Sequence, residues 1–158
     1  MATSSSNNAD PFAAALRLLT GRDRSEAELS EKLKQFGFSA EAIATALEKC
    51  REYSYLDDRR YALERSRAML RNGRGFGIKI LLELRRRGID ESTATAALET
   101  AAAEIDSDQL LRDQLQLRFP GFCYATADAK QRRRVVSFFQ RRGFSLGQIF
   151  NILYQPEA

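Results

Sequence analysis

Apolar residues recur at helical spacing along the chain. Phe12, Leu16 and Leu19 stand at positions i, i+4 and i+7, which is the period of one face of an α-helix. The breaks between segments contain glycine, and most segments begin at a helix-capping residue: Asp10, Ser25, Ser39, Asp90, Asp106, Asp128 and Ser145. No strand pattern separates the first three segments. The pattern therefore predicts an all-α protein.

The helical segments fall into three related groups. Gly37, Gly88 and Gly143 each end the second helix of a group, 51 and 55 residues apart. Eight and four positions before each glycine the residues are apolar, and ten positions after it stands a leucine: Leu29, Leu33 and Leu47; Ile80, Leu84 and Leu98; Val135, Phe139 and Leu153. A period near 50 residues is typical of repeats that are too small to be stable alone and stack on their neighbours.

We therefore expect three tandem three-helix repeats that form an elongated, curved array. Their predicted bounds are residues 11–55, 56–104 and 105–158. The first ten residues, MATSSSNNAD, are polar and have little to bury, so residues 1–10 are expected to be a disordered tail.

The positive charge is unevenly distributed. The chain carries a net charge of +4, with 7 basic and 7 acidic residues in 11–55, 10 and 8 in 56–104, and 8 and 5 in 105–158. A balance that becomes basic toward the C-terminus indicates an acidic partner, either a nucleic acid or an acidic groove of a protein.

The adjacent acids Asp57 and Asp58 admit two interpretations. A catalytic or metal-binding pair would need further ligands, and the chain contains no histidine. A helix N-terminus, where a carboxylate accepts from free N–H groups and faces the positive end of the dipole, is an ordinary place for aspartate. We interpret them as the cap of a helix that runs to Arg71.

The glycines Gly73, Gly75 and Gly77 also have two interpretations. A phosphate-binding loop would need the GK[ST] ending or a preceding strand, and neither is present in the sequence. A turn between two helices that requires left-handed backbone conformations explains them better.

Arginines supply the candidate binding residues. One side of a helix carries Arg60, Arg67, Arg71 and Arg74. Few acidic residues stand at the spacing that would pair with them: Glu64 can serve Arg60 and Arg67, and Arg71 has no acid four positions before or after it. A solvated face, or cations that complement a helix dipole, would be the ordinary explanation, whereas unpaired arginines suit phosphates or carboxylates of a partner. The candidates are Arg67, Arg71, Arg74, Lys79, Arg85, Arg86, Arg87, Arg132, Arg133, Arg134, Arg141 and Arg142.

Aromatic residues of the last repeat offer a second candidate surface. Phe138, Phe139, Phe144, Phe150 and Tyr154 have the side chains on which single-stranded bases stack. Their helical spacing favours a place in the hydrophobic core instead.

A known family resembles this pattern. The middle of the chain contains Leu56-Asp57-Asp58, Tyr61-Ala62, a basic run to Gly75, Ile80, Glu83-Leu84 and Gly88-Ile89. This series resembles the central repeat of the RecX recombination regulators. Its structural motif consists of Leu56, Asp57, Asp58, Tyr61 and Gly88. Arg24-Ser25, Glu28-Leu29, Lys32-Leu33 and Gly37-Phe38 resemble the first repeat. The similarity covers about residues 12 to 155. Ala94 departs from it, because the aligned positions in the other two repeats hold the bulkier Ile43 and Ile149.

The resemblance implies a regulatory binding protein without enzymatic activity, metal or cofactor. Such a protein binds the filament of the RecA recombinase, inhibits its growth and its recombinase, ATPase and coprotease activities, and so modulates DNA repair and the SOS response. The rival hypothesis is a helical module that binds single- or double-stranded DNA through phosphates, without base specificity. No nucleophile with a nearby base and no nucleotide-binding loop is recognisable.

The expected environment is the cytoplasm, where the protein would act as a monomer without a membrane. Cys50 and Cys123 are far apart and follow no secretory leader, which favours a reducing compartment over a disulfide framework. No apolar run approaches the roughly 18 residues of a membrane helix.

Overall fold

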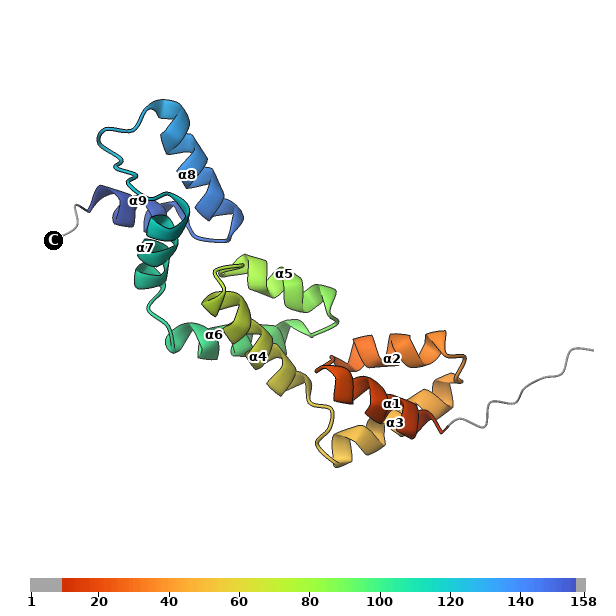
Figure 1. Ribbon diagram of the computed structural model, residues 1–158. Coiled ribbons are helices and arrows are strands. Elements are labelled where there is room, and N and C mark those ends of the chain that lie inside the picture. The colour runs from red at the N-terminus through yellow and green to blue at the C-terminus, as the bar shows by residue number, and fades with distance from the viewer. Residues whose placement is uncertain (1–9, 156–158) are drawn as a thin grey trace, which may run out of the picture. The chain divides into compact units, whose positions relative to one another are not determined.

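The computed structural model describes residues 10–155, and this part of the chain contains nine α-helices and no strand (Figure 1). The prediction of an all-α fold is confirmed. The predicted disordered tail lies, apart from Asp10, outside the described residues. The helices are α1 (Pro11–Gly21), α2 (Glu26–Gln35), α3 (Ala40–Glu52), α4 (Asp58–Arg71), α5 (Ile78–Arg86), α6 (Glu91–Ala103), α7 (Ser107–Arg118), α8 (Ala129–Arg141) and α9 (Leu146–Tyr154).

Side chains cap the N-termini as the sequence predicts. Each cap accepts a hydrogen bond from a backbone N–H two or three residues further on, which satisfies a group that has no partner inside the helix. Asp128 shows the full capping box, because the side chain of Gln131 also accepts from the backbone of Asp128. The confirmed caps are Asp10, Ser25, Ser39, Asp90, Asp106, Asp128 and Ser145.

The chain forms two compact units. Of the described residues, the first unit contains 10–61 and Arg86–Ile89, and the second contains Ala62–Arg85 and 90–155. In the first unit, α1, α2 and α3 pack against one another (Figure 1). Their core consists of Ala14, Ala15, Leu29, Leu33, Ile43, Leu47, Cys50 and Leu56.

In the second unit, α9 packs against both α7 and α8. Phe76, which precedes α5, stacks on Phe144 with ring centroids 3.8 Å apart. The backbone N–H of Phe76 donates to the carbonyl of Arg142 over 2.7 Å. These contacts bring the turn after α4 against the turn between α8 and α9. Leu111, Val135, Phe139, Phe144, Ile149, Ile152 and Leu153 are buried in this unit.

The apolar positions that define the three repeats are buried as predicted. The residues eight and four positions before the turn glycines, from Leu29 to Phe139, are all at most 2% exposed. Leu98 is half-buried, whereas Leu47 and Leu153 are buried. Ala94, the departure from the family pattern, is also buried at 3% exposure. The repeat fold is confirmed, and the exact repeat boundaries stay a prediction.

Candidate partner-binding surface

The turn between α4 and α5 begins and ends at glycines in the left-handed region. Gly73 has a φ of 62° and Gly77 a φ of 47°, conformations that cost other residues energy. At Gly75 a Cβ would lie 2.7 Å from the terminal methyl group of Met69, a flexible side chain that can move aside. The interpretation as an interhelical turn is confirmed at Gly73 and Gly77.

The two adjacent aspartates cap two different helices. Asp57 accepts from the backbone N–H groups of Arg59 and Arg60 over 3.0 and 3.2 Å, at the start of its own helix α4. Asp58 accepts from the backbone N–H of Glu26 over 2.8 Å, at the first residue of α2. The capping interpretation is confirmed for Asp57. The role of Asp58 was not predicted, because it depends on a residue 32 positions away.

One further residue of the structural motif, Tyr61, belongs to a polar network around Glu28 in the first unit. The hydroxyl of Tyr61 donates to Glu28 over 2.8 Å, and the guanidinium groups of Arg22 and Arg87 lie 3.0 and 3.5 Å from its other oxygen. Burial raises the pKa of Glu28, but the Tyr61 hydroxyl and the two arginines outweigh it and hold that pKa below its ordinary value. The hydroxyl of Ser25 also donates to the carbonyl of Arg87.

Two motif residues support this network by packing. Leu56 is buried at 3% exposure. Gly88 has a φ of 81°, and a Cβ there would overlap the side chain of Ala27. Because Arg87 is half-buried and paired with Glu28, its guanidinium contributes to the fold, and its part in partner binding stays a prediction.

Arg67 is also paired, contrary to the prediction of an unpaired arginine stripe. Its guanidinium donates to both carboxylate oxygens of Glu104, over 2.6 and 2.8 Å, and to Glu64 over 2.6 Å. The hydrogen bonds that Arg67 donates to Glu104 and Glu64 raise its pKa. The sequence did not reveal Glu104 as a partner because it lies 37 residues away. A partner of Arg67 must therefore displace two carboxylates.

The rest of the predicted stripe fits the expectation better. Arg71, Arg74 and Arg85 are exposed, and none forms an ion pair within residues 10–155. Arg86 is exposed as well. Lys79 donates from Nζ to the carbonyl of Arg141 over 2.7 Å, so its ammonium group satisfies the C-terminal end of α8.

Two of the candidate arginines in the third repeat, Arg132 and Arg142, stabilise the fold. Arg132 donates to the carbonyls of Tyr124 and Ala125 over 2.8 and 3.3 Å, and its guanidinium lies 4.4 Å from the centre of the Tyr124 ring. Arg142 donates to the carbonyl of Gly73 and lies 4.6 Å from the centre of the Phe138 ring. Both were predicted as binding residues, and the structure gives both internal partners.

Arg133, Arg134 and Arg141 are exposed on α8 and form no ion pair within residues 10–155. Arg118 belongs with these arginines, although it was not among the binding residues predicted from the sequence. Burial, and then repulsion from Arg118 and Arg74, lowers the pKa of Arg142. Arg118 could have been found from its place in the last turn of α7, beside Phe119 and Pro120.

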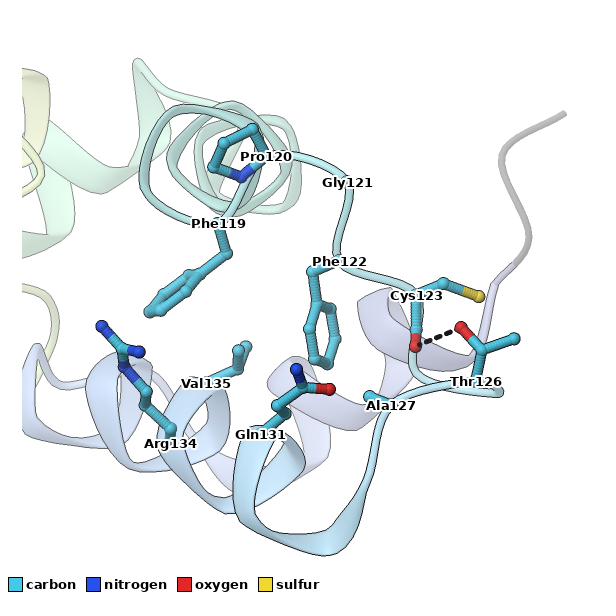
Figure 2. Close-up of a pocket in the computed structure, with 10 residues that line it drawn as sticks. All are labelled: Phe119, Pro120, Gly121, Phe122, Cys123, Thr126, Ala127, Gln131, Arg134 and Val135. Carbon is cyan, nitrogen blue, oxygen red and sulfur yellow. Dashed lines mark hydrogen bonds between the residues drawn. The ribbon is translucent and has the colours of Figure 1, made fainter.

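A groove runs between the segment 118–127 and α8. It consists of two cavities of about 260 and about 300 Å³, and Phe119 and Arg134 line both. Figure 2 shows the rings of Phe119 and Phe122 on one side of the first cavity, with Gln131, Arg134 and Val135 of α8 opposite. We call these two cavities the α7–α8 groove.

The aromatic residues of the last repeat divide between core and surface. Phe139 and Phe144 are buried, as predicted. Phe138 and Phe150 are half-buried, and Tyr154 is 60% exposed, so the core interpretation was wrong for Tyr154. Phe138 lines the second cavity of the groove, so the core interpretation is incomplete for this ring.

The described residues offer neither a metal cluster nor a membrane helix. Within 10–155, no three His, Cys, Asp or Glu side chains gather as metal ligands would. The helices of the same stretch lack the length and apolarity needed to cross a bilayer. Cys50 is buried, Cys123 is exposed, and both thiols are free.

Comparison with known proteins identifies the chain's relatives. Family models for the first and second three-helix domains of RecX match residues 12–50 and 57–98. Regulatory protein RecX of Syntrophotalea carbinolica is 41% identical over 141 residues, which cover 89% of this chain and 92% of that protein. The protein of the same name from Trichlorobacter lovleyi is 40% identical over 142 residues, with coverage of 90% and 92%.

Solved structures share the fold. The crystal structure of RecX from Lactobacillus salivarius superposes with a TM-score of 0.72 at 23% identity, over 90% of this chain and 91% of that one. Another crystal structure, of a regulatory protein RecX, gives a TM-score of 0.72 at 26% identity, over 90% of this chain and 69% of that one.

Proposed function

The chain belongs to the RecX family of regulatory proteins, and we propose that it binds the RecA recombinase filament and inhibits its growth. Inhibition lowers the recombination, ATPase and coprotease activities of the filament and so modulates DNA repair. The protein acts by binding and without catalysis, as a monomer in the cytoplasm. The names of its relatives support regulation, and they are silent about the partner.

The observation that carries the proposal is the exposed, unpaired arginine set beside the glycine turn. Arg71 and Arg74 form no ion pair within residues 10–155, although 21 acidic residues are present in the chain. Guanidinium groups in this state bind carboxylates or phosphates of a partner through paired, planar hydrogen bonds. Charge complementarity of this kind raises the association rate and fixes the orientation of the complex.

The test is the DNA-dependent ATPase activity of RecA with this protein at substoichiometric ratio. We expect the unaltered protein to slow ATP hydrolysis, and the double variant Arg71→Glu/Arg74→Glu to need a roughly tenfold higher concentration for the same effect. Arg17→Glu is the matched control, because Arg17 is exposed on α1 and forms no ion pair within the described residues. Unchanged inhibition by the double variant would contradict the proposed surface.

A salt series separates this function from the rival one, binding to DNA alone. Affinity for bare DNA falls linearly on logarithmic axes as salt displaces the phosphate contacts. We expect the filament to be bound more tightly than bare DNA at physiological salt, and with a shallower slope. Equal affinities with the same steep slope would favour the DNA-binding module.

A further inference from the structure

The α7–α8 groove presents one continuous face of α8. Its lining residues on that helix are spaced at i, i+3, i+4, i+7 and i+10: Gln131, Arg134, Val135, Phe138 and Arg141. The opposite wall comes from the end of α7 and the segment that follows it. The larger cavity, of about 300 Å³, is at the lower end of the roughly 300–1,000 Å³ range of small-molecule sites.

The larger cavity is lined by three cations and no acid. Arg118, Arg134 and Arg141 surround it, and among the residues of the described chain no carboxylate lines either cavity. Arg74 and Arg142 lie close enough that Arg118 and Arg74 disfavour the charged form of Arg142. A cluster of mutually repelling guanidinium groups without an internal counterion is stabilised when an anion binds.

Two phenyl rings stand beside these arginines. Phe119 and Phe138 meet edge to face, with centroids 5.2 Å apart and an interplanar angle of 87°. The Arg134 guanidinium lies 5.8 Å from the centre of the Phe119 ring. Both rings are half-buried and line the second cavity of the groove, and the Arg142 guanidinium lies 4.6 Å from the centre of the Phe138 ring.

The combination of arginine and phenyl rings selects the chemistry of the ligand. A peptide run of acidic residues alone supplies carboxylates for the arginines but no flat, apolar face for the rings. A nucleotide supplies both, because its phosphate pairs with guanidinium and its base stacks on an aromatic ring. A base inside a duplex is already stacked on its neighbours, so only a free or single-stranded nucleotide can use the rings.

We propose that the α7–α8 groove binds the phosphate and base of a nucleotide, either as a free nucleotide or as one unit of a single strand. Arg118, Arg134 and Arg141 hold the phosphate, and Phe138 provides a stacking surface for the base. The inference goes beyond filament inhibition and needs no recombinase. Its failure and that of the proposed function are therefore distinguishable.

The first experiment measures the fluorescence anisotropy of a labelled oligothymidylate without recombinase, over a salt series. In Arg134→Gln/Arg141→Gln, we expect weaker binding and a salt slope shallower by about 1.4, since each lost contact to a single strand removes about 0.7. In Phe138→Leu, which keeps apolar volume, we expect roughly tenfold weaker binding and an unchanged slope. Lys130→Gln removes one charge from α8 outside the groove and should bind as tightly as the unaltered protein.

The second experiment uses the unaltered protein, so it does not depend on how the variants fold. Displacement of the labelled strand by thymidine 5′-monophosphate would assign the groove to a free nucleotide. Displacement only by unlabelled single strand would assign it to a strand unit.

Three outcomes would overturn the proposal. One is that Arg134→Gln/Arg141→Gln binds the labelled strand as tightly as Lys130→Gln does. Another is competition by duplex DNA as strong as that by single strand of equal charge. The third is equal competition by polyglutamate, which would assign the groove to an acidic peptide.

Discussion

The side chain of Asp58 in the first turn of α4 accepts a hydrogen bond from the backbone N–H of Glu26 at the start of α2, over 2.8 Å. Its neighbour Asp57 accepts instead from the N–H groups of α4 itself. Two successive carboxylates thus satisfy the N-termini of two helices. In the first unit, this bond fixes the first turn of α4 to α2.

Replacement of Asp58 tests this bond. We expect Asp58→Ala to lower the free energy of unfolding by about 1 kcal/mol, the usual effect of losing an N-terminal cap, as measured by urea denaturation. Asp23→Ala is the control, because the Asp23 carboxylate is exposed and makes no hydrogen bond within residues 10–155. Equal stability of the two variants would show that the Asp58 bond contributes nothing.

Acid should weaken the first unit through Glu28. Its folded-state pKa lies below the ordinary value of 4.5, so the unfolded chain takes up a proton more readily than the folded one. The stabilisation is complete above pH 4.5 and is lost as the pH falls through the folded-state pKa. Urea denaturation at successive pH values should show this loss.

The variant Glu28→Gln should have a free energy of unfolding that depends less on pH below 4.5. Glu48→Gln should keep the dependence of the unaltered protein, because Glu48 is exposed on α3 and forms no ion pair within the described chain. A pH dependence that is the same in both variants would assign the acid sensitivity to other groups.

Gly143 should tolerate no side chain. Its φ is 102°, and a Cβ would overlap the backbone carbonyl oxygen of Phe76. We expect Gly143→Ala to lower the free energy of unfolding by more than about 2 kcal/mol. Gly147→Ala is the matched control in α9, where a Cβ meets no atom within 4 Å. That change should raise stability by up to about 1 kcal/mol.

The pairing of Arg67 with Glu104 predicts the result of charge reversal. Arg67→Glu places three carboxylates together, since Glu64 and Glu104 both contact this position, and should lower the melting temperature more than Arg67→Gln does. The swapped variant Arg67→Glu/Glu104→Lys should recover much of the loss, because opposite charges again face each other. A swap no more stable than Arg67→Glu alone would show that the pair is not coupled. Because replacing Arg67 is expected to lower stability as well, assays of inhibition should use variants of Arg71 and Arg74.

The local features of the fold were predictable from sequence. Asp10, Ser39 and Asp106 cap the helices that follow them, because a capping side chain bonds to N–H groups two or three residues away. The burial of Leu33, Leu84 and Phe139 followed from spacing relative to the turn glycines. Such features depend on neighbours within one or two helical turns, which the sequence lists directly.

The candidate site was less predictable, because its charges act over long sequence separations. A search for acids four positions away misses the Arg67 partner Glu104 and the Arg87 partner Glu28. It also misses carbonyl acceptors such as that of Gly73, which receives a hydrogen bond from Arg142. Arg118 was overlooked because nothing in its neighbours shows that it lies beside Arg142.

Local patterns in the sequence were enough to establish that the chain is helical, where most of its helices begin and that most residues at the repeat positions are buried, because capping and amphipathic periodicity are local. The sequence also carried the resemblance to the RecX family. Only the tertiary structure decided which arginines hold the fold and which remain free to bind. Ion pairs, hydrogen bonds and cavities depend on the distance in space between residues that lie far apart in the sequence, up to 69 positions for the hydrogen bond from Arg142 to Gly73. The order of residues alone does not give that distance.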